Sequence, residues 1–129
     1  MLDHIGFGVS DFVRAKDFYT KALAPLGYRV VMEVINPQES GGGAYAGFGD
    51  DRKPCFWIGT GPRLSGQLHV AFAAKDRAAV DAFYRAAIGA GGTDNGKPGL
   101  RPYYHPNYYG AFVLDPDGHN VEAVCHAAE

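Results

Sequence analysis

The chain has 129 residues, of which 47% are hydrophobic and 20% charged, enough for one folded domain or for two small modules with a shared core. Its formal net charge of −2, without a basic cluster, argues against a nucleic-acid partner. No apolar run approaches a membrane span, and the start of the chain lacks the basic-then-apolar pattern of a secretion signal. Two cysteines are too few for a disulfide framework, so we expect a cytoplasmic protein with reduced thiols.

The sequence repeats itself at an offset of 65 residues, without a gap over nearly its whole length. The segment that begins at His4 aligns with the segment that begins at His69, and the same shift aligns Phe18-Tyr19 with Phe83-Tyr84. A fixed internal period predicts two copies of one structural unit, over residues 1–61 and 66–126. Because either copy alone would bury little surface, we expect both to pack into a single domain over residues 1–129.

The first copy predicts a strand, a helix and three further strands. Residues 2–9 alternate between bulky apolar side chains and a small-residue face that carries His4. A helix is predicted from the N-cap Asp11 to the terminating Gly27, with apolar residues at helical spacing that cover the bulky face of the strand. Extended stretches follow at residues 28–35, 44–49 and 55–59.

The second copy predicts the same order of elements after a short linker. A strand around His69 leads into a helix that begins at Asp76 and ends at Gly91-Gly92. The later strands are a weak one before Leu100, then residues 110–114 and 120–125, the last two joined by an Asp-Pro-Asp-Gly turn. Each copy therefore has the order β-α-β-β-β, which predicts an α+β fold with a mixed sheet.

Three potential metal ligands fall on the same predicted face of the sheet. His4 and His69 occupy equivalent positions beside small residues, and Glu122 lies on the last strand, where an unpaired carboxylate is costly. Two imidazoles and one carboxylate with open coordination positions suit Fe(II), Mn, Ni or Zn. The alternative is a metal-free binding fold with ordinary polar histidines. His119, in a turn expected to be exposed, and His126, in the C-terminal tail, are not expected to be ligands.

The motifs of the chain resemble those of a known superfamily. They are Leu2–Asp11, Phe18-Tyr19, His69 and the run from Phe112 through Asp-Pro-Asp-Gly to Glu122. This pattern is similar to the glyoxalase, bleomycin-resistance and extradiol-dioxygenase group, the vicinal oxygen chelate superfamily. The resemblance implies paired βαβββ modules that form a U-shaped sheet around one divalent metal ion, held by the two aligned histidines and the glutamate. It also implies a homodimer that binds a small molecule.

Position 57 departs from the lactoylglutathione lyases of this superfamily. Those enzymes use a fourth ligand, a glutamate related to Glu122 by the repeat, and the offset places Trp57 there instead. Isomerising a hemithioacetal needs a base beside the metal. We therefore expect a glyoxalase-like lyase or isomerase for a substrate with vicinal oxygens, and not a true lactoylglutathione lyase. Trp57 is either a core residue or, as its strand parity favours, a cavity residue that stacks on a substrate ring.

Two other functions fit the same motifs. A small extradiol dioxygenase would use the same three ligands on Fe(II), although most such enzymes are longer. A resistance protein would bind a small aromatic molecule without a metal. Fosfomycin thiol transferases also share the three ligands, but they need basic residues that this chain does not cluster.

The segment from Arg101 to Gly110 contains four tyrosines and a histidine, and the equivalent segment of the first copy has no such aromatic cluster. It predicts a loop over the mouth of the cavity, in which Arg101, Tyr104 and Tyr109 contact the substrate. His105 is the candidate general base in place of the missing glutamate. An aromatic surface loop or a dimer contact is the alternative.

Overall fold

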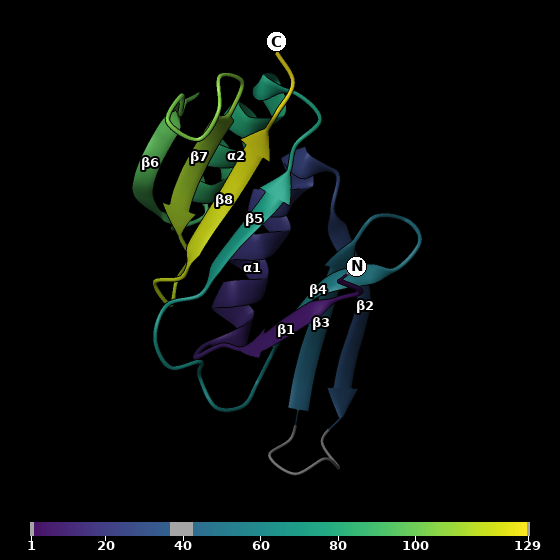
Figure 1. Ribbon diagram of the computed structural model, residues 1–129. Coiled ribbons are helices and arrows are strands. Elements are labelled where there is room, and N and C mark those ends of the chain that lie inside the picture. Colours follow the sequence, from purple (N-terminus) through teal and green to yellow (C-terminus); the bar gives the residue numbers. More distant parts are fainter. Residues whose placement is uncertain (1, 37–42, 129) are drawn as a thin grey trace.

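The computed structural model describes residues 2–36 and 43–128, and this part of the chain forms two modules of the same construction (Figure 1). The first contains β1 (Ile5–Gly8), α1 (Phe12–Leu23), the 3-10 helix η1 (Ala24–Leu26), β2 (Arg29–Asn36), β3 (Gly43–Gly49) and β4 (Pro54–Gly59). The second contains β5 (His69–Ala73), α2 (Arg77–Gly89), β6 (Thr93–Leu100), β7 (Tyr109–Leu114) and β8 (Asn120–Cys125). The predicted α+β class and the tandem βαβββ order are confirmed.

Each module forms a four-stranded mixed sheet, and the strand order is the same in both. The orders are β1-β4-β3-β2 and β5-β8-β7-β6. The first strand of each module pairs in parallel with the last, and the remaining pairs are antiparallel. The strands that begin beside the aligned histidines, β1 and β5, are therefore edge strands, and within the described residues no ladder joins one to the other.

The predicted helix boundaries agree with the structure. The side chain of Asp11 accepts a hydrogen bond from the amide of Arg14 at 3.1 Å, and Asp76 accepts one from Ala79 at 2.7 Å. Gly27, with φ of 86°, ends η1 in the left-handed conformation that favours glycine. None of the helices in the described residues is long and apolar enough to cross a membrane.

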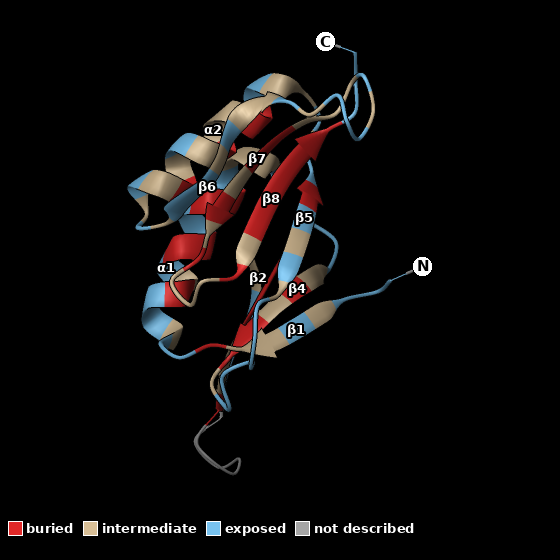
Figure 2. Ribbon diagram, turned by 60° about the vertical axis from the view of Figure 1, so that its left-hand side comes forward, coloured by how far each residue is buried: buried red, intermediate tan, exposed pale blue. Residues whose placement is uncertain are grey.

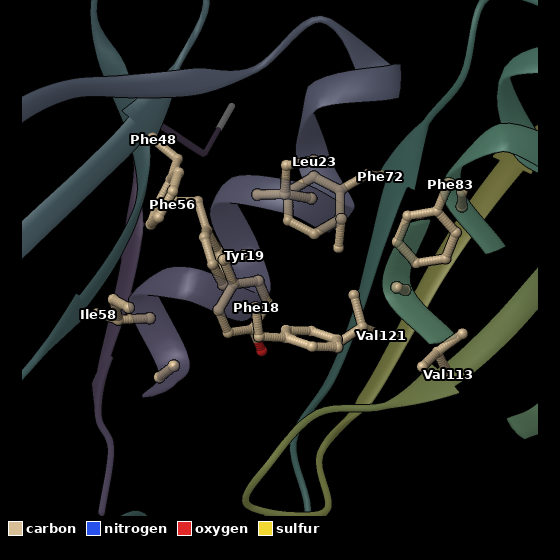
Figure 3. Close-up of a cluster of buried hydrophobic side chains, with 14 of the residues drawn as sticks. Phe18, Tyr19, Leu23, Phe48, Phe56, Ile58, Phe72, Phe83, Val113 and Val121 are labelled. Carbon is tan, nitrogen blue, oxygen red and sulfur yellow. The ribbon is translucent and has the colours of Figure 1, made fainter. Parts of the chain in front are cut away.

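A single core joins the two modules. Helix α1 packs on β2 and β4, α2 packs on the three strands β6, β7 and β8, and the two helices contact each other. Figure 3 shows that buried side chains from both modules meet between these layers, among them Phe18, Tyr19, Phe56 and Phe83. The rings of Phe56 and Phe72, one from each module, lie 5.2 Å apart. Buried residues of both modules therefore belong to one hydrophobic core.

The strand before Leu100 is longer than its weak sequence signal predicted. β6 spans eight residues although it contains Gly96, Pro98 and Gly99, which disfavour strands. It lies at the edge of its sheet and its pairing with β7 shifts register twice, so the proline and glycines are tolerated. By contrast, the central strand β8 is buried along most of its length (Figure 2).

Candidate functional site

Glu122, His69 and Tyr108 meet on the face of the second sheet that is turned away from α2. Glu122 lies opposite Phe112 of β7 and Ala71 of β5, and it is 1% exposed. His69 Nε2 lies 2.9 Å from Glu122 Oε1, and the Tyr108 hydroxyl donates a hydrogen bond to Oε2. Among the described residues no lysine or arginine forms an ion pair with this carboxylate, so its charge is met by a histidine and a phenol.

The Tyr108 phenol stays protonated in this setting. Burial, followed by the hydrogen bond to Glu122 and the charge of that carboxylate, raises the pKa of Tyr108 far above its ordinary value. The hydroxyl is therefore a donor at any physiological pH. It holds one oxygen of Glu122 and leaves the other facing His69.

The spacing of His69 and Glu122 fits two ligands of one metal ion. Donor atoms bonded at about 2.1 Å, at right angles to each other, are about 3 Å apart. The observed 2.9 Å between Nε2 and Oε1 matches that geometry. An imidazole nitrogen with a carboxylate oxygen suits the borderline divalent metals. Half of the His69 side chain, 54%, is exposed, so this donor pair opens to the uncovered face.

His4 lies on the first module, just before β1, and is not beside His69 and Glu122. The described residues contain no group of three or more His, Cys, Asp or Glu side chains that could hold a metal ion. His4 Nδ1 lies 2.7 Å from Asp3 Oδ1, and the side chain is 59% exposed. A carboxylate on one ring nitrogen leaves Nε2 free, which is the usual arrangement of a metal-binding histidine. One chain therefore brings together two of the three predicted ligands.

Trp57 lies on the uncovered face of the first sheet, in register with Gly6 of β1 and Gly47 of β3. It is half-buried and lines an open cavity of about 570 Å³ together with His4 and Tyr45. This is the face that its strand parity predicted.

Arg101 lies over the same face of the second sheet as Glu122. Its guanidinium is 5.4 Å from the centre of the Phe112 ring, which in turn is 6.3 Å from the His69 ring. The guanidinium also donates hydrogen bonds to the carbonyls of Gly99 and Lys97, at 2.8 and 2.7 Å. These bonds fix the side chain against β6, close to the candidate metal ligands.

The predicted base, His105, contacts Tyr108 rather than Glu122. Its ring lies 5.5 Å from the Tyr108 ring, and its Nε2 is 2.7 Å from Nδ1 of His126. The amide of Asn107 donates to His105 Nδ1 at 3.1 Å, which assigns the proton of a neutral ring to Nε2. His105 then donates to His126. The ring of Tyr104, also predicted to contact substrate, lies 4.8 Å from the Tyr108 ring and is 59% exposed.

Tyr109 lies on the opposite face of β7 from these residues. Its hydroxyl donates to Asp81 of α2 at 2.7 Å, and the Arg77 guanidinium lies 5.2 Å from its ring centre. The structure therefore directs Tyr109 to the helix and away from Glu122. The neighbouring Tyr108 was not among the predicted site residues. The sequence signal for it was its place in the tyrosine-rich segment from Arg101 to Gly110. In the structure a Cβ at Gly110 would fall 3.2 Å from the Tyr108 ring.

The prediction that His119 lies in an exposed turn was wrong, because its side chain is 1% exposed. Asp115 accepts hydrogen bonds from the amides of Asp117 and His119, at 2.9 and 2.8 Å, and this turns the histidine inward. Its Nδ1 accepts a hydrogen bond from the Leu68 amide at 3.0 Å, and its ring packs on Phe7 at 5.4 Å. His119 therefore connects the two modules.

Comparison with known proteins decides the family. The model of the Glyoxalase/Bleomycin resistance protein/Dioxygenase superfamily matches residues 1–123. The chain belongs to this superfamily. The resemblance drawn from the motifs of the sequence is thereby confirmed. The name of the superfamily covers lyases, binding proteins and oxygenases, so membership by itself leaves the activity open.

Solved structures of the glyoxalase superfamily share this fold. A glyoxalase/bleomycin resistance protein from Albidiferax ferrireducens T118 is 28% identical, with a TM-score of 0.69 over 97% of this chain and 98% of that one. A mutant of glyoxalase I from Zea mays is 25% identical, with a TM-score of 0.73 over 95% of this chain. This chain spans only 46% of the maize protein. No curated protein sequence matches the chain.

Proposed function

We propose that this superfamily member is a metal-dependent lyase or isomerase for a small substrate with vicinal oxygens. His69 and Glu122 of one copy, with His4 of the partner subunit, would hold one divalent ion, Zn, Ni, Mn or Fe(II). The observation that carries the proposal is the buried Glu122 carboxylate, which lies 2.9 Å from a histidine nitrogen and has no lysine or arginine partner among the described residues. Such a carboxylate is costly to bury unless a cation joins it.

The two edge strands support a site made by two copies. Among residues 2–36 and 43–128, β1 and β5 each pair on one side only, and the unpaired backbone groups of an edge strand bind other strands readily. If a two-fold axis placed β1 of one copy beside β5 of the other, the same pair of strands would meet at two places in the dimer. It would also carry His4 of each copy toward His69 and Glu122 of the partner.

The residues around this site have separate roles in the proposed reaction. His69, Glu122 and the partner's His4 would hold a divalent ion, which would supply a Lewis acid for the two substrate oxygens. Tyr108 keeps Glu122 oriented, and Arg101 offers positive charge to an anionic group of the substrate. Trp57 of the partner subunit, which borders the cavity of His4, would form a wall of the site. Proton transfer would fall to His105 once its Nε2 leaves His126, because both of its ring nitrogens are hydrogen-bonded in this arrangement. Because Trp57 stands where a lactoylglutathione lyase has its second glutamate, the substrate is not expected to be that hemithioacetal.

The second candidate is a metal-free protein that binds a small aromatic molecule. It is favoured by the contacts of Glu122, because His69 faces one carboxylate oxygen and Tyr108 donates a hydrogen bond to the other. It is also favoured by the aromatic lining of the first-module cavity.

Metal analysis of protein purified without chelator tests the proposal. We expect about one ion per chain, either as purified or after loading with Fe(II), Mn, Ni or Zn. His4→Ala and His69→Ala should each abolish binding. His126→Ala is the matched control, because that histidine is exposed and outside the proposed ligand set. A stoichiometry near zero with all four ions would favour the metal-free candidate, and oxygen uptake with catechols would favour a dioxygenase.

A further inference from the structure

Two aromatic side chains of the first sheet lie on glycines. Trp57 pairs across the sheet with Gly47, and Tyr45 pairs with Gly59. A Cβ at Gly47 would fall 2.8 Å from Cζ2 of the indole, and one at Gly59 would fall 2.7 Å from Cε1 of the tyrosine ring. Both distances are well inside van der Waals contact, so each ring occupies the space directly above its glycine. The glycines thus form a floor on which the two rings lie.

Both rings border the open face of the sheet. They line the cavity of about 570 Å³ that His4 also borders, and a second one of about 280 Å³ that extends along Gly6 and Gly8. Each ring is only partly buried. One face of each ring is therefore supported by backbone while the cavity side is accessible to a ligand.

The second module has the opposite arrangement at the equivalent positions. The offset of 65 aligns Tyr45 with Gly110 and Trp57 with Glu122. The second module therefore has the carboxylate of Glu122 at the position of the indole. At the position of Tyr45 it has Gly110, which lies beneath the ring of Tyr108. The two faces thus differ in chemistry at these aligned positions, where the first has two aromatic rings and the second has a glycine and a carboxylate.

Charges around the two rings are balanced. Lys53 Nζ lies 2.5 Å from Asp3 Oδ2, and the same carboxylate contacts His4. Lys53 is thereby neutralised by a carboxylate of the same cavity. A surface of this kind favours an uncharged planar ring, which gains stacking contacts without leaving an ion unpaired.

We propose that Tyr45 and Trp57 form a stacking site for an uncharged, planar aromatic ring of a small molecule, and that this binding needs no metal ion. Because His4 borders the same cavity, a stacked ring would lie beside a proposed metal ligand. Only the placement of the ring beside a metal ligand rests on the proposed function; the stacking on Tyr45 and Trp57 does not.

The test uses 2-naphthol and its saturated analogue 2-decalol as probes of metal-free protein. Trp57 is the only tryptophan, so its indole N–H gives a single cross-peak in a nitrogen–proton NMR spectrum. We expect 2-naphthol to shift this peak saturably through its ring current, and 2-decalol to leave it in place. By calorimetry, Trp57→Leu and Tyr45→Leu should each weaken 2-naphthol binding at least about fivefold, whereas Trp57→Phe, Tyr45→Phe and the exposed control Tyr103→Leu should retain it.

Repeating the titration with Glu122→Gln separates this proposal from the metal-dependent function. An unchanged 2-naphthol affinity in that variant supports a stacking site that is independent of the metal, even if metal analysis of the wild type shows none. Equal shifts with 2-naphthol and 2-decalol, or full affinity in Trp57→Leu, would overturn the stacking site even if the protein binds metal. If dilution alone moves the indole peak and 2-naphthol does not, a second copy covers the rings and the proposal is wrong.

Discussion

At the scale of single residues, the contact between Tyr108 and Glu122 organises the candidate site. The phenol donates to one carboxylate oxygen, while the other oxygen faces His69. Gly110 makes this possible, because a Cβ there would fall 3.2 Å from the tyrosine ring and 3.3 Å from Glu122 Oε2. Hydrogen bonds to a metal-binding carboxylate commonly set its orientation and so its affinity for the ion.

Replacing Tyr108 by phenylalanine removes that hydrogen bond and keeps the ring. We expect metal affinity to fall about tenfold and the free energy of unfolding to fall by about 1–2 kcal/mol, because a buried carboxylate loses a partner. Competition with a chromophoric chelator and urea unfolding measure the two effects. The exposed Tyr103→Phe is the control, and an unchanged affinity in Tyr108→Phe would show that the phenol does not orient Glu122.

Tyr19 predicts how stability depends on alkaline pH. It is fully buried and its hydroxyl lies 2.5 Å from Asp115 Oδ2. Burial, then the charge of and hydrogen bond to Asp115, raises the pKa of Tyr19 well above the ordinary tyrosine value. The folded state therefore keeps the proton that the unfolded chain loses above about pH 10. The stabilisation is present below that pH and is lost as the pH rises above it.

Above pH 10 the free energy of unfolding should therefore fall less steeply with pH in Tyr19→Phe than in the wild type, by about 1.4 kcal/mol per pH unit. At neutral pH the variant should be less stable by about 1–2 kcal/mol, because Asp115 loses a hydrogen bond. Urea unfolding between pH 7 and pH 11 measures both. The same slope in wild type and variant would contradict a raised pKa at this residue.

At the scale of elements, the turn between β7 and β8 ties the two modules together. The Ser10 amide at the start of the first helix donates to Asp117 at 3.0 Å, and the Gln67 amide group donates to the Gly118 carbonyl at 3.0 Å. His119 adds the hydrogen bond from Leu68 at the start of β5. The turn therefore holds the connection between β1 and α1 and the end of the linker that leads into β5.

The variant His119→Phe tests whether this hydrogen bond holds the Leu68 amide locally, apart from any effect on the stability of the whole protein. The variant loses the acceptor for the Leu68 amide, but it also removes a buried Nε2 that has no hydrogen-bond partner among the described residues. The two effects oppose each other, so we expect the free energy of unfolding to change by less than about 1 kcal/mol. The Leu68 amide should exchange with deuterium about tenfold faster. Unchanged exchange at Leu68 would mean that the histidine does not hold the linker.

At the scale of the whole molecule, the two faces that carry His4 and Glu122 belong to different sheets. Each sheet has a free edge, at β1 and at β5, and one chain alone does not gather the three predicted ligands among its described residues. A dimer would supply the missing histidine twice by symmetry.

Mixing two variants tests this arrangement. His4→Ala and His69→Ala each break every two-chain site, yet a mixed dimer has one site with all three ligands. Unfolding and refolding an equal mixture should therefore restore about a quarter of the wild-type metal content, because about half of the dimers are mixed and each has one intact site. Both side chains are more than half exposed, so both variants are expected to fold. A site within one chain would give no restoration.

Local patterns in the sequence determined the order of the elements and the family. Alternation around His4 and His69, the caps Asp11 and Asp76 and the stop at Gly27 act over a few residues, so they can be recognised without the fold. The offset of 65 also marked where the two copies differ in chemistry.

Only the tertiary structure decided which side chains meet. It joined Tyr108 to Glu122, directed Tyr109 to α2 and buried His119 between the modules. It also separated His4 from His69, although both begin equivalent strands. Strand parity predicts the face on which a side chain lies, but it does not predict how two sheets pack. Contacts between the modules depend on that packing, which brings together residues far apart in the chain.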